Sequence, residues 1–252
     1  MRAAPTMRTA TDTIMATSPS TTATTDGPPR LRPALLRLMQ LVSPSLPVGG
    51  FTYSQGLEWA VEAGWVRDAA DTEDWLTGEL TATLAPLDLP VAARMMGAVG
   101  AGDRGGLQHW IDLLLAARET SELRAEERQR GRAMADLLCA LGLPAAADWR
   151  DLLAQSQMAG FAFAATRWEI PVADGLGGLA FAWAENLTLA AVKLVPLGQS
   201  DGQRVLARLA GRIPAMVDLA LGLGDHDIGA SSPALAIASA RHEQQYTRLF
   251  RS

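Results

Sequence analysis

Residues that commonly bind metals or act as nucleophiles are few in this chain and stand far apart. The three histidines and the single cysteine are His109, His226, His242 and Cys139. The nearest approach to a ligand cluster is the segment 225–227, Asp-His-Asp, but three consecutive side chains rarely converge on one ion. Glycines flank this segment, which favours a solvated loop. We therefore expect no metal site and no bound cofactor, with a weak site doubled across a dimer axis as the alternative.

The sequence also lacks the common phosphate-binding and nucleophile motifs. It contains no GxxxxGK[ST] loop and no GxSxG turn, and the glycine-rich segment 175–178 does not follow a predicted strand. Cys139 lies on the apolar face of a predicted helix, where a small buried hydrophobic residue is a better interpretation than a nucleophile. We expect a binding protein and not an enzyme. The alternative is a helical enzyme, which converging ionisable groups with perturbed pKa values in a pocket would reveal.

The composition describes a mildly acidic globular chain. Of its 252 residues 48% are hydrophobic, and 22 basic against 27 acidic side chains give a net charge of −5. This apolar fraction excludes global disorder, and the acidic balance gives no electrostatic reason to bind nucleic acid. The most apolar stretch, 176–197, is interrupted by Glu185, Asn186 and Lys193, so we expect no membrane span. A lone cysteine fits a reducing compartment, and we predict a cytoplasmic protein.

The chain divides into a short polar segment and a long helical one. Residues 1–30 are rich in Thr, Ser, Ala and Pro, which predicts a disordered tail. Beyond it, apolar residues recur at i, i+3, i+4 and i+7, as in Leu35, Leu38, Met39 and Val42. No segment shows the sustained alternation that is typical of a strand. The sequence therefore predicts an all-α fold, a single-domain bundle of roughly ten helices over residues 31–252.

Proline, glycine and capping residues predict the helix boundaries. The loop 43–50 precedes a helix over 52–63, which Gly64 ends. Asp71 is expected to cap the next helix, which runs toward Pro86. Further helices are expected near 89–99, 104–118, 120–141, 157–168, 175–195, 201–222 and 233–246, with a loop or short turn at 143–151.

Two polar segments have structural interpretations. Ser200 and Gln203 are spaced as a capping box for a helix that begins near Asp201. Glu126 and Arg130 stand four residues apart in a charge-rich helix and can form an ion pair. We expect this second segment to be a solvated helix face.

Four segments, in this order and within a helical chain, resemble the family of urease accessory proteins called UreF. They are SPSLPVGGFTYSQGLE at 43–58, RETSELR at 118–124, KLVPLGQSDGQ at 193–203 and RHEQQYTRLFRS at 241–252. Each segment alone is moderate evidence for the resemblance, and the occurrence of all four in the same order is strong evidence. The resemblance covers most of 33–252 and leaves the segment 1–30 outside it.

The resemblance implies a role in urease maturation. Proteins of this family are not enzymes; they are helical, tend to form homodimers and bind the accessory protein UreD, called UreH in some species. The complex recruits the GTPase UreG and joins apo-urease, into which nickel is inserted. Whether a UreF-like protein activates UreG or restrains its GTP hydrolysis is left open by the sequence.

The resemblance also places partner-binding residues in the matching segments. Aromatic residues on a rigid turn, and Tyr, Arg and Phe in a terminal segment, are types that dominate interface energies. Lys193 is the only lysine of the chain, and Arg248 matches the family's terminal Tyr-x-Arg-Leu pattern. We expect the terminal segment 241–252 to become ordered when UreD/UreH or a second protomer binds. The predicted partner-binding residues are Phe51, Tyr53, Gln55, Glu58, Lys193, Gln199, Asp201, Gln203, His242, Tyr246, Arg248 and Phe250.

Overall fold

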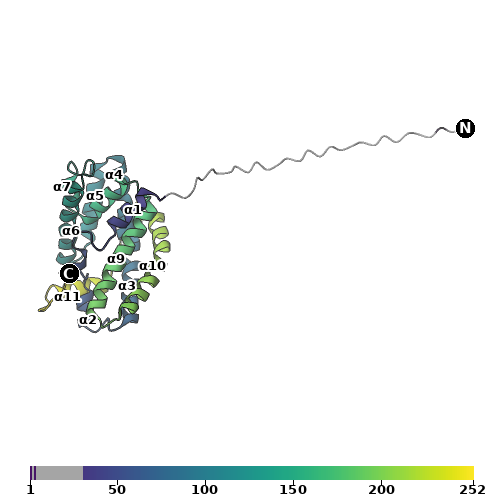
Figure 1. Ribbon diagram of the computed structural model, residues 1–252. Helices are drawn as coiled ribbons and strands as arrows, with labels where there is room; N and C mark the ends of the chain where they lie inside the picture. Colours follow the sequence, from purple (N-terminus) through teal and green to yellow (C-terminus); the bar gives the residue numbers. More distant parts are fainter. Residues whose placement is uncertain (2, 4–30) are drawn as a thin grey trace. The chain divides into compact units, whose positions relative to one another are not determined.

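The computed structural model describes Met1, Ala3 and residues 31–252 of the chain (Figure 1). The predicted disordered tail, 1–30, otherwise lies outside the described residues. Arg32–Ser252 form one compact unit, and the sections below concern that unit alone. None of the helices in the described part is both long and apolar enough to cross a membrane.

Within residues 31–252 all regular elements are helices, and there is no strand. The α-helices are α1 (Pro33–Leu41), α2 (Leu57–Glu62), α3 (Ala69–Glu79), α4 (Leu89–Ala101), α5 (Arg104–Ala117), α6 (Ser121–Ala140), α7 (Arg150–Leu153), α8 (Gln157–Arg167), α9 (Val172–Leu194), α10 (Gln199–Gly222) and α11 (Pro233–His242). Three further helical segments are η1 (Gly50–Thr52), η2 (Leu80–Asp88) and η3 (Asp225–Asp227). The predicted all-α class is confirmed.

The helix predicted over 52–63 is too long at its start. Gln55 and Gly56 have φ angles of 50° and 79°, which no α-helix accommodates. The segment instead forms the short turn η1 and then α2, which begins at Leu57. A Cβ atom at Gly56 would lie 2.9 Å from the backbone nitrogen of Ser239, so only glycine allows this close approach to α11. The predicted stop at Gly64 is confirmed by its φ of 74°.

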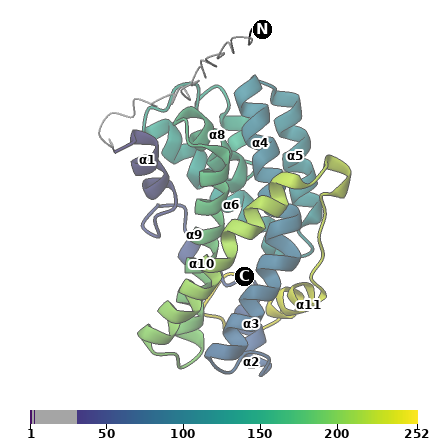
Figure 2. The same ribbon diagram turned by 90° about the vertical axis from the view of Figure 1, so that its right-hand side faces the viewer.

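Pro86 does not end a helix as expected. The π-helical segment η2 contains it and joins α3 to α4 in one continuous rod (Figure 2). A proline lacks the N–H that an α-helix needs, and a wider π-turn absorbs the defect locally. The cap of α3 is also one turn earlier than predicted: the Asp68 side chain accepts hydrogen bonds from Ala70 and Asp71, while Asp71 pairs with Arg67.

The predicted capping box at the start of α10 is wrong. The helix begins at Gln199, and its N-cap residue, Gly198, offers no side chain to cap it. Asp201 pairs with Arg204 instead. The expected loop at 143–151 leads into the short helix α7, which begins at Arg150.

The main hydrophobic core surrounds α8, whose Phe161 and Phe163 are completely buried against α4 and α6. Small residues bring α6 and α8 close together: a Cβ atom at Gly131 would lie 2.7 Å from the backbone nitrogen of Ser156. This contact carries polar side chains of α6 into the interior. A second, smaller cluster joins α2, the end of α9 and α11, and it includes Leu57, Val195 and Phe250.

Candidate functional site

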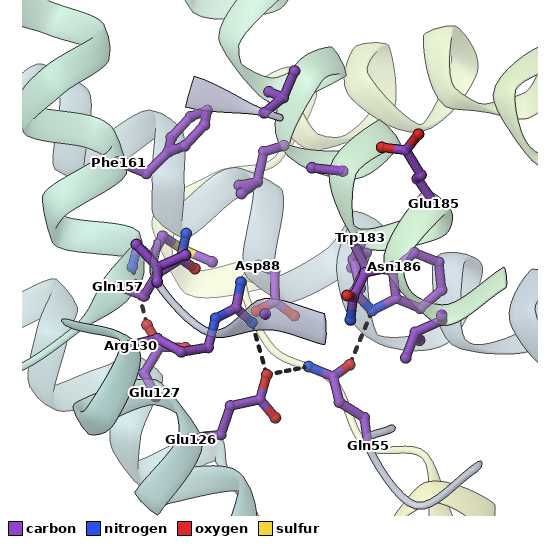
Figure 3. Close-up of a pocket in the computed structure, with 18 of the residues that line it drawn as sticks. Gln55, Asp88, Glu126, Glu127, Arg130, Gln157, Phe161, Trp183, Glu185 and Asn186 are labelled. Atoms are coloured by element: carbon purple, nitrogen blue, oxygen red, sulfur yellow. Dashed lines mark hydrogen bonds and ion pairs between the residues drawn. The ribbon is translucent and has the colours of Figure 1, made fainter. Parts of the chain in front are cut away.

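A pocket with a cavity of about 140 Å³ opens between the loop after α1, η2, α6 and α9 (Figure 3). Its wall combines apolar side chains, such as Phe161 and Trp183, with an unusual number of charged ones. The charged residues that line it are Glu79, Asp88, Arg118, Glu126, Glu127, Arg130 and Glu185. Five carboxylates and two guanidinium groups therefore surround one cavity.

Arg118 is the cation at the buried end of the pocket. Its guanidinium donates to Asp88 Oδ1 and lies 3.5 Å from Glu127 Oε2. Glu127 Oε1 also accepts hydrogen bonds from Ser156 Oγ at 2.7 Å and from the backbone nitrogen of Met158 at 3.0 Å. Burial alone would raise the pKa of Glu127, but Arg118 and these hydrogen bonds outweigh it and hold the pKa below its usual range.

The other buried carboxylates of the pocket are less well compensated. Burial raises the pKa of Asp88, an effect that Arg118 only partly offsets. Burial also raises the pKa of Glu79 to about 7, although Ser232 Oγ donates to its Oε1 at 2.8 Å. The second oxygens of these two side chains, Asp88 Oδ2 and Glu79 Oε2, have no hydrogen-bond partner in the described part of the chain. Glu79 can therefore exchange a proton near neutral pH.

Gln55 joins the pocket to the turn before α2. Its amide donates to Glu126 Oε1 at 3.1 Å, and its carbonyl oxygen accepts from Trp183 Nε1 at 3.0 Å (Figure 3). Arg130 Nη1 donates to the same Glu126 oxygen at 2.7 Å. The predicted ion pair between Glu126 and Arg130 is confirmed, but the predicted solvated face is wrong at this point. Glu126 is only 3% exposed because the turn at Gln55 and the end of the chain cover it.

The pocket meets part of the criterion for a helical enzyme, since ionisable groups with perturbed pKa values converge there. The arrangement nevertheless pairs most of the carboxylates with arginines of the same chain. No histidine or cysteine lines it. Among the described residues, no three His, Cys, Asp or Glu side chains gather in a way that could hold a metal ion. Three of the five carboxylates of the pocket, Asp88, Glu126 and Glu127, therefore lie against arginines of the same chain.

A second polar cluster holds the end of the chain against α2 and α6. We call it the C-terminal clasp and define it by the side chains of Glu58, Glu122, His242 and Arg248. His242 Nδ1 lies 2.7 Å from Glu122 Oε2, and His242 Nε2 lies 3.2 Å from Glu58 Oε2. Arg248 Nη1 donates to Glu122 Oε1 at 2.7 Å. Three contacts of carboxylate oxygens, two with His242 and one with Arg248, therefore connect α2, α6, α11 and the terminal segment.

Glu58 also binds the backbone of the terminal segment. Its two carboxylate oxygens accept hydrogen bonds from the backbone nitrogens of Leu249, at 2.6 Å, and Phe250, at 2.8 Å. The Phe250 ring is buried in the second hydrophobic cluster, and Lys193 Nζ lies 5.7 Å from its centroid. A cation and an aromatic face at this distance attract one another.

The last residues continue this contact along the turn before α2. The backbone nitrogen of Arg251 donates to Thr52 O at 2.8 Å, and that of Ser54 donates to Ser252 O at 2.8 Å. Ser252 Oγ donates to Glu126 Oε2 at 3.1 Å. Glu126 thus links the clasp region to the pocket. The terminal segment, for which we expected order only with a partner, packs in this structure against its own chain.

Half of the predicted partner-binding residues come together around this segment. The clasp and its surroundings include Gln55, Glu58, Lys193, His242, Arg248 and Phe250. Tyr53 is buried and its hydroxyl donates to Gln129 Oε1 at 2.9 Å, whereas Phe51 and Tyr246 are exposed. Gln199, Asp201 and Gln203 lie apart at the start of α10 and make no hydrogen bond to the clasp within the described part.

Several residues of the pocket and the clasp were not predicted as site residues from the sequence. They are Glu79, Asp88, Arg118, Glu122, Glu126 and Glu127. A helical pattern marks such carboxylates as polar surface, and their partners lie far away in sequence. Glu122 and Arg118 had one available signal, because both belong to the segment 118–124 that carried the family resemblance.

The fold and these two clusters define the class of protein: it is all-helical, its charged residues line a polar pocket, and they bind its own terminal segment. Comparisons with known proteins identify the family. The UreF family model matches residues 66–210, and the chain belongs to the UreF family. It is 52% identical over 227 residues to the urease accessory protein UreF of Alcanivorax borkumensis, with 87% of this chain and 98% of the relative covered.

Two further relatives carry the same name. The urease accessory protein UreF of Pseudomonas putida (strain GB-1) is 55% identical over 219 residues, with 87% of this chain and 98% of the relative covered. That of Escherichia coli O157:H7 is 50% identical over 217 residues, with 86% and 97% covered. The resemblance to this family inferred from the four segments is confirmed.

Proposed function

We propose that this protein is a non-enzymatic scaffold of urease maturation, which binds UreD/UreH and brings the GTPase UreG to apo-urease for nickel insertion. The observation that carries the proposal is the similarity to proteins named urease accessory protein UreF. That similarity spans 97–98% of the length of the three relatives described above. The turn 43–58 and the terminal segment, which both carried the family resemblance, are brought together in the structure.

The surface beside the clasp supports a binding role. Tyr246 is fully exposed, Leu249 is largely exposed, and Phe51 stands next to Thr52, whose carbonyl oxygen holds Arg251. Tyrosine and large apolar side chains of this kind often contribute most of the binding energy of an interface. Glu58 holds the backbone of Leu249 in advance, which lowers the entropy that a partner has to remove there. We therefore assign the UreD/UreH contact to this face.

The relation to UreG forms the second part of the proposal. Lys193 is exposed at the end of α9 and stays close to the terminal segment through Phe250. It is our choice for the UreG contact. The scaffold could speed GTP hydrolysis by UreG, for example by supplying an arginine, or it could restrain it. Measurement of UreG turnover with and without this protein distinguishes the two. The same proposal includes a cytoplasmic homodimer, which cell fractionation and the mass of the purified chain test.

Co-purification with UreD/UreH and UreG, followed by mass determination on a sizing column, tests the scaffold role. The intact chain is expected to form a stable complex, and deletion of residues 241–252 to abolish it. Retention of both partners after this deletion would overturn the assignment of the interface. Failure of the intact chain to bind either partner would overturn the proposed function.

The two tyrosines of the chain offer a matched pair of variants. Tyr246→Ala removes an exposed side chain and is expected to weaken UreD/UreH binding without changing the stability of the fold. Tyr53→Phe removes a buried hydrogen bond and is expected to lower stability while leaving binding intact. Arg248→Ala is a less direct probe, because Arg248 contacts Glu122 within the chain and its loss loosens the clasp itself.

A further inference from the structure

The pocket carries more negative charge than its own arginines balance. Five carboxylates and two guanidinium groups line it, and the ion pairs of the two arginines use Asp88, Glu126 and Glu127. The other two carboxylates, Glu79 and Glu185, form no ion pair within the described part of the chain. A shielded carboxylate without a cation is unfavourable, and a bound cation would offset that cost.

Two carboxylate oxygens of the lining also lack a hydrogen-bond donor. Asp88 and Glu79 are each only 5% exposed, and Asp88 Oδ2 and Glu79 Oε2 have no partner among the described residues. Their other oxygens accept from Arg118 and Ser232. The third unpartnered atom of a charged lining residue, Arg130 Nε, is a donor. Because an ionised carboxylate only accepts hydrogen bonds, a ligand that satisfies both oxygens must bring donors.

The rest of the wall is apolar and aromatic. Phe161 of α8 and Trp183 of α9 line the cavity (Figure 3), and the indole N–H of Trp183 is fixed by Gln55 at 3.0 Å. An aromatic ring attracts a cation through its face, and an apolar wall favours a ligand that contains carbon over a hydrated inorganic ion. The wall therefore fits an organic cation.

The cavity has room for such a ligand and lies next to solvent. Its volume is about 140 Å³, whereas one water molecule needs about 10–15 Å³. Pro44 and Phe51 line it from the loop after α1 and from η1, and both are exposed. A ligand of a few non-hydrogen atoms can therefore enter between this loop and α9.

We propose that the pocket binds a small organic cation, whose alkylammonium or guanidinium group donates to the unpartnered oxygens of Asp88 and Glu79. The carbon atoms of the ligand contact Trp183 and Phe161, and Glu185 adds a further negative charge to the wall. The site does not depend on the proposed function, because it rests on groups of this chain alone. A chain that fails to bind UreD/UreH can still bind the cation.

The acidity of the lining agrees with this site. Burial raises the pKa of Glu79 to about 7, and the negative charges of Glu119 and Asp88 add to the effect. Burial also raises the pKa of Asp88 and of Glu185. A raised pKa means that the ionised form lacks compensation, which a cation would supply. Protons and the ligand compete for the same oxygens, so binding is best measured at about pH 8, where Glu79 is mostly ionised.

Isothermal titration calorimetry on the full chain tests the proposal, with propylammonium and methylguanidinium as probes and propanol as the uncharged control. A buffer with about 150 mM NaCl suppresses weak attraction to the acidic surface. We expect saturable binding of at least one cation with a dissociation constant near or below about 1 mM, and at least about tenfold weaker binding of propanol.

NMR places the bound cation in the pocket. The indole N–H signal of Trp183 should shift with the same midpoint as the calorimetric titration. The chain contains seven tryptophans, and the absence of one signal in Trp183→Phe assigns it.

Two variants separate this site from attraction to acidic surface groups. Glu79→Gln removes one ionised acceptor and should weaken binding of the cation at least about tenfold. Glu73→Gln lies on the same helix, α3, and changes a carboxylate that pairs with Arg208 outside the pocket, so it should bind normally. Circular dichroism verifies that both variants are folded; if Glu79→Gln is not, Glu185→Gln replaces it and should also weaken binding.

Any of three results would overturn the site. The first is the absence of saturable binding of either cation up to about 10 mM. The second is an affinity for propanol equal to that for propylammonium. The third is an unchanged affinity for the cation in the folded pocket variant.

Discussion

The pocket and the C-terminal clasp both depend on carboxylates of α6, Glu127 and Glu122, but they use them differently. In the pocket, Glu127 lies between Arg118 and the start of α8, so its partners belong to the main core. In the clasp, Glu122 is bound by His242 and Arg248, which belong to the last part of the chain. We therefore expect charge in the pocket to contribute to the stability of the whole fold, and charge in the clasp to hold the terminal segment in place.

Glu126 stands between the two regions. One of its oxygens binds Gln55 and Arg130 at the pocket, and the other binds Ser252 at the end of the chain. A change in either region therefore alters the hydrogen bonds of this one buried side chain. The comparison predicts that variants of the pocket alter global unfolding, whereas variants of the clasp alter local exchange.

The largest effect is expected from Arg118→Leu. This change leaves Asp88 and Glu127 buried without their cation and should lower the free energy of unfolding by about 3–5 kcal/mol. Urea unfolding followed by circular dichroism measures it. Arg204→Ala, which breaks an exposed pair with Asp201, is the control and should change stability by less than about 0.5 kcal/mol. Equal effects of the two variants would contradict a structural role for the buried pair.

Glu79→Gln should produce a pH-dependent gain in stability. The pKa of Glu79 is raised from about 4.5 to about 7, so the folded state binds more protons than the unfolded state between these values. Its contribution is therefore most favourable below that range and is lost as pH rises through it. The variant should be more stable than the unmodified chain by about 2 kcal/mol at pH 8 and nearly equal to it at pH 4. A difference independent of pH would contradict the raised pKa.

Glu58→Gln should act on the clasp alone. The amide group cannot accept from Leu249 and Phe250 as both carboxylate oxygens do, and protection of these two amides should fall about tenfold. Glu62→Gln, one turn later on α2, is the matched control and should leave them protected. Loss of protection in α8 as well would show that the clasp is not a separate unit.

The smallest effect is expected from Tyr53→Phe. Loss of the hydrogen bond from its hydroxyl to Gln129 should lower the free energy of unfolding by about 1 kcal/mol. Tyr246→Phe, at an exposed position, should leave stability unchanged. A larger loss in Tyr246→Phe than in Tyr53→Phe would reverse the distinction between the buried and the exposed tyrosine.

Features fixed by neighbouring residues were predictable from the sequence. Helical periodicity gave the fold class, and Gly64 gave the end of α2, because both depend on local backbone preferences. The path through Pro86 was not predictable, because packing on both sides of η2 overrides the usual helix stop. The left-handed turn at Gln55 was missed for a similar reason: its side chain is held by Trp183 and Glu126 from other helices.

Helical periodicity could not predict which charged side chains are buried. Glu126 and Glu127 stand on the polar face of α6, and their partners Gln55 and Ser156 are 71 and 29 residues away. Three of the four residues of the clasp, Glu58, His242 and Arg248, were selected from the family resemblance, which did not indicate that they lie in one cluster. Only the folded chain shows that a cation of the terminal segment and carboxylates of two helices form one cluster.

Affinity for UreD/UreH is the most direct test of the central claim, that the clasped terminal segment presents the partner surface. The full chain and its Tyr246→Ala variant are titrated with purified UreD/UreH, with Arg150→Ala, which breaks an exposed pair with Asp136, as a surface control. We predict that Tyr246→Ala binds at least about tenfold more weakly, with unchanged thermal stability, and that the control binds normally. Equal affinity of all three proteins would contradict the claim.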